Sequence, residues 1–155
     1  VETLLTNPSL LTLIPLFSEE SGSLISILGA KLSSGLHSGL VEPLSRPKGE
    51  AVNDFKICFV LAIIVFPLIG ILAEASSISF GTIGVGFDKI IPISLISGII
   101  LVSIMVFVVY YISAISYNRN LDPDNIVIPV SASVTDLISS LILISVSLFI
   151  LSIFI

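Results

Sequence analysis

Charged residues are scarce in this chain of 155 residues. Six are Lys or Arg and eleven are Asp or Glu, which is 11% of the chain against about 25% in a typical soluble domain. The hydrophobic share is 55% and the mean hydropathy is +1.18. Such a composition cannot give a soluble monomer its polar surface, so lipid must solvate the chain. The net charge of −5 at pH 7 repels phosphates and excludes nucleic-acid binding.

The chain has one cysteine, Cys58, and no tryptophan. A single cysteine excludes an intrachain disulfide and any site built from several thiolates. Because Cys58 lies inside an apolar run, we expect a buried thiol. No secretory signal and no soluble domain are recognisable. We therefore expect one membrane domain over residues 1–155, and no enzyme.

Apolar runs predict an all-helical membrane protein with four transmembrane segments. Three runs are clear spans against the roughly 20 residues needed to cross about 30 Å of hydrocarbon. They are Ile57–Ala73, Ile90–Tyr117 and Ile126–Ile155. The last two are long enough to tilt or to project from the bilayer.

The remaining segment comes first in the chain and is interrupted. Its apolar pieces are Leu10–Phe17 and Leu24–Leu40. The polar stretch Ser18–Ser23 separates them, and Pro15 interrupts the first piece. We predict one crossing made of a broken or extended helix. A break in lipid needs protein or water to satisfy its backbone groups, so the polar stretch is a candidate ion path. The alternative is a short interfacial helix joined by a turn.

The basic residues predict the orientation. Arg46, Lys48 and Lys56 lie between the first and second spans, Arg119 lies between the third and fourth, and only Lys89 lies between the second and third. The excess of Lys and Arg places the Arg46 and Arg119 loops in the cytoplasm, with both chain ends outside. We expect a multi-pass protein of the cell membrane, with one further helix preceding residue 1.

Asp136 is the most informative residue of the sequence. It is the only charged residue in Ile126–Ile155 and lies about 15 Å along that run, near the bilayer midplane. A central Asp costs about 2.5–3.5 kcal/mol on insertion scales, and such residues usually mark an ion or proton path. The structural alternative is a neutral, protonated Asp136 that is hydrogen-bonded to a neighbouring helix.

Small and hydroxyl-bearing residues share the helical side of Asp136. Ala132, Ser133, Ser139 and Ser140 lie three or four residues away. Pro129 frees main-chain oxygens one turn earlier. Carboxylate, hydroxyl and carbonyl oxygens are ligands suited to Mg²⁺ or Ca²⁺ and argue against zinc or copper. Small residues also let helices approach, so the serines alone favour close helix packing over ligation of an ion.

One carboxylate does not complete a cation site. Mg²⁺ keeps several waters, so paired Asp136 side chains at a two-fold interface could hold a largely hydrated ion. This predicts a homodimer. Glu19, Glu20, Asp122 and Asp124 add negative charge near the proposed path, which would raise the local cation concentration. The equally weighted alternative is that each is simply a solvated loop carboxylate.

A second motif indicates a different ion. Residues Thr82–Asp88, with the sequence Thr-Ile-Gly-Val-Gly-Phe-Asp, resemble the potassium-channel filter Thr-Val-Gly-Tyr-Gly-Asp. Phe87 is inserted, however, and Glu74–Gly81 is too short for the pore helix of that family. A potassium-like transporter thus stays only as an alternative to divalent transport. Two further alternatives are a proton-coupled carrier, in which Asp136 takes up a proton, and a structural subunit that moves no ion.

The segment Asp122–Asp136 resembles the Asp-Pro, Pro-hydrophobic, Thr/Ser-x-x-Asp signature of the MgtE-type divalent cation transporters, especially of their eukaryotic solute-carrier relatives. Ile14–Leu16, Gly22–Leu24 and Lys31–Ser34 are similar to the family's Pro, Gly-Asn and Arg-Leu-Ser-Thr pattern. This chain has Ser23 where the family usually has Asn, and Lys31 where it often has Arg.

The resemblance implies helices two to five of a five-helix domain, without the cytoplasmic regulatory domains of many bacterial members. It implies Mg²⁺ or broader divalent transport through a pore at a two-fold interface, lined by the helix that ends near Lys31 and by the Asp136 helix. Asp136 and the carbonyl of Ala132 would surround the hydrated ion, and Ser133, Ser140 and Ser23 complete the expected site.

Overall fold

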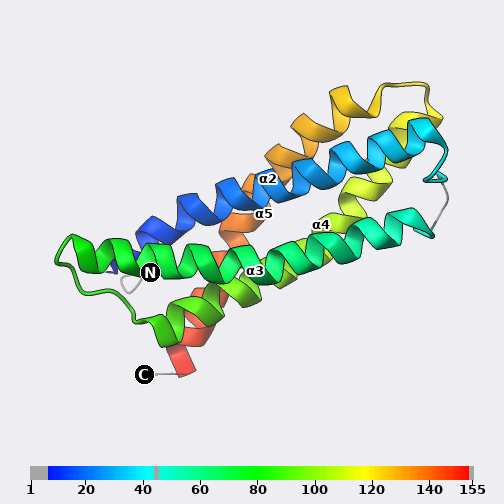
Figure 1. Cartoon of the computed structure of the whole chain (residues 1–155). Helices are drawn as coiled ribbons and strands as arrows, with labels where there is room; N and C mark the ends of the chain where they lie inside the picture. Colours follow the sequence, from blue (N-terminus) through cyan, green and yellow to red (C-terminus); the bar gives the residue numbers. More distant parts are fainter. Residues whose placement is uncertain (1–6, 44–45, 154–155) are drawn as a thin grey trace.

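The computed structural model is a bundle of long helices joined by short loops (Figure 1). It describes residues 7–43 and 46–153, apart from the side chain of Asp124. In these ranges there are no strands, and the helices are α2 (Pro8–Ser38), α3 (Glu50–Ser79), α4 (Phe87–Asn118) and α5 (Pro123–Ile153). All four are long and apolar enough to cross a membrane. The predicted fold class is confirmed.

The helices alternate in direction, so α2 runs parallel to α4 and antiparallel to α3 and α5 (Figure 1). Helices α2 and α4 contact each other, and each also contacts α3 and α5, whereas α3 and α5 do not touch. The loops that carry Arg46 and Arg119 lie at one end of the bundle, and the α3–α4 loop lies at the other. Val1 and Ile155, predicted to lie outside the cell, are not among the described residues.

Helix α2 is continuous over 31 residues. Of the two predicted forms, the extended helix is correct, and the predicted break at Ser18–Ser23 is wrong. The polar stretch is accommodated by packing: Ser18 bonds to α5, Ser21 is fully buried, and the two glutamates face outward. Pro15 removes one backbone donor without ending the helix, as is tolerated when neighbouring helices support the backbone.

Small residues allow the helices to approach closely. The backbone of Gly98 on α4 lies against the Phe66 ring on α3, where an added Cβ atom would overlap the ring. Gly29 on α2 lies against Val127 of α5, where an added Cβ atom would be only 3.1 Å from Val127 Cγ1. Phe17 stacks on Phe66 with ring centroids 4.9 Å apart, which extends this core from α3 to α2. Small-residue contacts of this kind are typical of helix packing in membranes.

Candidate cation site

Asp136 lies about 20 Å along α5, a helix about 45 Å long at 1.5 Å per residue. Its side chain is exposed on the face that α5 shares with α2. Ser18 Oγ on α2 donates a hydrogen bond to Asp136 Oδ1 at 3.1 Å, and a Cβ atom at Gly22 would lie 3.9 Å from the same oxygen. The carboxylate therefore lies over the seam between the two helices.

The predicted α5 partners share a face with Asp136. Ser133 is exposed and Ser140 half-buried, and both lie on the same side of α5 as the carboxylate, while Ala132 is half-buried beside Ser133. Ser133 Oγ donates to the carbonyl of Pro129 at 2.9 Å, and Ser140 Oγ donates to the carbonyl of Asp136 at 3.2 Å. Each hydroxyl thus uses its proton within the helix, and its lone pairs remain acceptors.

Ser23, the predicted residue on the other helix, is exposed on α2 one position after Gly22. It lies on the adjacent helix, but the hydrogen bond from α2 to Asp136 comes from Ser18 and not from Ser23. The structure therefore brings the α5 residues together and leaves Ser23 beside them. The direct α2 partner is Ser18, which lies within the polar stretch but was not predicted as part of the site. Its oxygen also lies 3.1 Å from Ser139 Oγ.

The electrostatic surroundings of Asp136 are negative. Glu19 and Glu20 are exposed on α2 directly after Ser18. Throughout residues 7–43 and 46–153 no Lys, Arg or His forms an ion pair with Asp136, since the ion pairs found join Lys31 to Asp54 and His37 to Asp122. The carboxylate is therefore hydrogen-bonded by a neutral hydroxyl and lacks a counter-charge.

The described residues of one copy do not group acidic, histidine and cysteine side chains into a cage for a metal ion. In the part of the chain that the structure describes, no three His, Cys, Asp or Glu side chains are placed to hold one ion together. Asp122 lies at the other end of α2, where its carboxylate is 3.8 Å from His37 Nε2 and accepts a hydrogen bond from Asn125 at 2.9 Å. Among the described residues, Asp136 thus has no second or third His, Cys, Asp or Glu side chain beside it as a ligand.

Most of the filter-like segment, residues 82–86, lies in the α3–α4 loop, and Phe87 and Asp88 begin α4. Helix α3 continues to Ser79, three residues before Thr82, and leaves no room for a pore helix. The amide of Gly86 donates to Glu74 Oε1 at 2.9 Å, and Thr82 Oγ1 donates to the carbonyl of Ser77 at 2.8 Å. These bonds tie the loop onto the end of α3, which is the geometry of a tethered turn.

A comparison with known protein families gives a match over most of the chain. The family model MgtE, described as a divalent cation transporter, matches residues 14–146. The match covers both motif regions on which the resemblance was based, and confirms it. No curated protein and no solved structure matches the chain.

Proposed function

Because the chain belongs to the MgtE family of divalent cation transporters, we propose that it carries Mg²⁺ across the cell membrane, with Asp136 as the ion-binding carboxylate. The observation that carries the proposal is the position of Asp136: exposed, in mid-helix, on the α2–α5 face, and without a counter-charge. A charge so placed is costly in lipid and usually faces an ion path. The proposal assigns transport and no enzymatic reaction.

The exposed carboxylate supports a pore between two copies. In a single copy, the α2–α5 face would turn Asp136 toward lipid, which opposes insertion by about 2.5–3.5 kcal/mol. A second copy related by a two-fold axis would cover the same face on both chains and bring two Asp136 carboxylates to one pore. The homodimer thus supplies both the missing shielding and the second carboxylate.

The hydroxyl geometry supports a hydrated ion. Waters bound to Mg²⁺ point their hydrogens outward, so the wall around them must offer acceptors. The Asp136 carboxylate and the lone pairs of Ser133 and Ser140 are such acceptors. We assign the Ala132 carbonyl and the Ser23 hydroxyl of α2 to the same shell, contacting the ion through water.

The distribution of basic residues supports one orientation. Arg46 and Arg119 lie in loops at the same end of the bundle (Figure 1), and we place this end in the cytoplasm by the excess of positive charge. The C-terminus then lies outside. The proposed ion path then runs along α2, from the outer side of the membrane toward the Arg46 loop.

Uptake into liposomes containing the purified protein tests the function. We expect Mg²⁺ uptake that other divalent ions compete for and that K⁺ leaves unchanged. Uptake that follows a pH gradient without divalent competition indicates a proton-coupled or monovalent carrier. A folded protein that moves no ion, in which Asp136→Asn changes only stability, indicates a structural subunit.

Cross-linking between copies tests the interface. We expect single cysteines at positions 133, 136 and 140, introduced into a Cys58→Ala background, to link two chains in membranes. Leu148 lies on α5 and is 39% exposed, so a cysteine there is the matched control and should link poorly. Linking at position 148, with none at the other three, contradicts the interface.

A further inference from the structure

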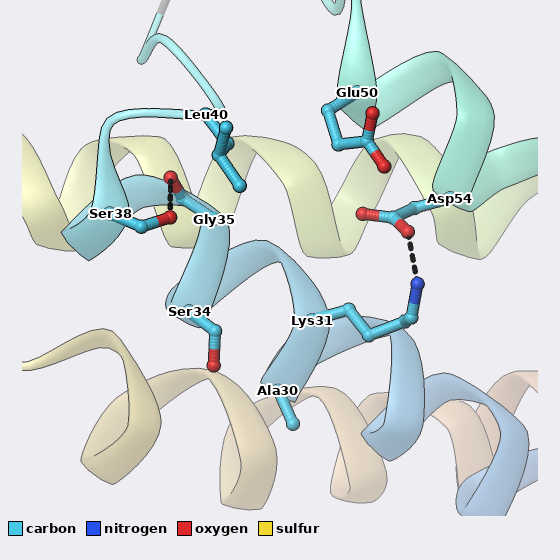
Figure 2. Close-up of a pocket in the computed structure, with 8 residues that line it drawn as sticks. All are labelled: Ala30, Lys31, Ser34, Gly35, Ser38, Leu40, Glu50 and Asp54. Atoms are coloured by element: carbon cyan, nitrogen blue, oxygen red, sulfur yellow. Dashed lines mark hydrogen bonds and ion pairs between the residues drawn. The ribbon is translucent and has the colours of Figure 1, made fainter.

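An ion pair joins α2 to α3 on the Arg46 side of Asp136. Lys31 Nζ lies 2.6 Å from Asp54 Oδ1. The two partners differ in burial: the side chain of Asp54 is 4% exposed, whereas that of Lys31 is 46% exposed. Figure 2 shows Lys31 reaching from α2 toward Asp54, with Glu50 one turn earlier on α3. The acid is thus fixed in the protein, and the lysine is the partner that can move.

The lysine lies beside open space. A hollow of about 480 Å³ separates the end of α2 from the start of α3, and Lys31, Ser34 and Glu50 are among its lining residues. Four flexible carbons carry the ammonium group, so without its partner it can take other positions in this hollow. The bond to Asp54 holds it in the observed position.

Lys31 also belongs to the exposed face of α2. Ser23, Ile27 and Lys31 follow one another at intervals of four residues and are all exposed, so they lie on one face. Along the helix axis Lys31 is about 14 Å from Gly22, the residue beside Asp136. It is the only Lys or Arg in α2 or α5. The two helices of the proposed pore thus carry a single permanent positive charge.

We propose that Asp54 is a positioning residue that holds the Lys31 ammonium group aside from the cation path, on the cytoplasmic side of Asp136. This inference rests on the proposed function. The geometry that supports it is the fixed, buried acid, the mobile base on the exposed side of α2, and the hollow that would receive the freed ammonium. At this axial separation of about 14 Å, a free ammonium repels a divalent ion and lowers its occupancy roughly tenfold when the effective dielectric constant is about 35, between the values for a protein surface and for water.

A purely structural ion pair predicts the opposite order of effects. Removing the lysine leaves a buried carboxylate without its partner, which is the costlier loss for folding, whereas removing the acid leaves a lysine that water can solvate. A structural pair therefore makes Lys31→Gln the more harmful change. The positioning role makes Asp54→Asn the more harmful change for ion binding and flux.

The test measures Mg²⁺ uptake into liposomes and Mg²⁺ binding in detergent for five proteins: the wild type, Asp54→Asn, Lys31→Gln, the double variant, and the conservative Asp54→Glu. We expect Asp54→Asn to lower uptake and affinity about tenfold. Lys31→Gln and Asp54→Glu should stay near the wild type. The double variant should recover most of the loss, because it has no ammonium left to free.

Each other outcome is decisive. If the double variant is as impaired as Asp54→Asn, the lost carboxylate itself is responsible and the positioning role is overturned. If Lys31→Gln is the more impaired single variant, the pair is structural. Thermal unfolding of all five proteins in detergent separates binding from folding. A wild type that binds but does not transport Mg²⁺ contradicts the proposed function, while the binding series still tests Asp54.

Discussion

Substituting Asp136 by Asn tests whether charge defines the cation site. The two side chains have nearly the same size, and the amide oxygen can accept the hydrogen bond that Ser18 Oγ donates to Oδ1 at 3.1 Å. The contact between α2 and α5 should therefore survive. What the substitution removes is one negative charge per copy from a site where no Lys, Arg or His of the described ranges forms an ion pair.

The expected loss follows from Coulomb's law. A carboxylate that contacts a hydrated Mg²⁺ through one water lies about 4 Å from it, and attracts it by about 2 kcal/mol even at the dielectric constant of water. This corresponds to a roughly 30-fold weaker binding constant for each carboxylate, and so to about a thousandfold when both copies in the proposed pore lose theirs. The less polar interior of a pore increases the loss. Replacing Ser133 or Ser140 by Ala removes one neutral acceptor, which a retained water replaces at modest cost, so affinity should fall by less than about tenfold.

The assay is Mg²⁺ uptake into liposomes at matched protein density, with binding measured in detergent on the same preparations. Ser133→Ala and Ser140→Ala are the matched controls, because they alter the same face of α5 without changing its charge. Near-normal transport by Asp136→Asn together with loss of transport in either serine variant would refute the reasoning. Hydroxyl geometry, and not carboxylate charge, would then define the site.

Two further predictions concern packing and the α2 partner. Gly98→Ala should destabilise the bundle by roughly 1–3 kcal/mol, because the added methyl group overlaps the Phe66 ring. Thermal unfolding in detergent measures this, and Gly22→Ala is the control, since its methyl group meets only Asp136 Oδ1 at 3.9 Å; equal melting temperatures contradict the packing. Ser18→Ala should weaken Mg²⁺ binding by less than about tenfold, and by less than Asp136→Asn does. A binding titration measures this, and a larger loss than that of Asp136→Asn would mean that Ser18 contributes more to ion binding than the carboxylate.

The sequence predicts the four helices well because lipid selects for uninterrupted apolar runs. It underestimates their length, since a hydropathy pattern ends where polar residues begin. Helix α3 starts at Glu50 and ends at Ser79, beyond both ends of the predicted Ile57–Ala73 span. The polar turns at each end continue the backbone hydrogen bonding of the helix outside the hydrocarbon.

The sequence misleads at the polar stretch of α2 because local signals omit distant partners. Pro15 and the stretch Ser18–Ser23 carry the composition of a break. The bond from Ser18 to Asp136 joins residues 118 positions apart, and only the folded bundle shows that α5 supplies a partner for this polar group. Helical spacing could place Ser133 and Ser140 beside Asp136 within α5, but it could not identify the contact from α2.

Three of the acids within the helices, Asp54, Glu74 and Asp136, show why a sequence alone cannot rank acids as cation ligands. Asp54 is paired with Lys31 at 2.6 Å, and Glu74 accepts a hydrogen bond from the amide of Gly86 at 2.9 Å. Both are buried, at 4% and 3% exposure, and each has a partner that a cation would have to displace. Asp136 is exposed, and its partner is a neutral hydroxyl. Within the described ranges Glu74 also lacks a positive partner, and its Oε2 has no hydrogen-bond partner, but it is buried. Because only Asp136 of the three is exposed to a hydrated ion, we expect a divalent ion to bind there most readily.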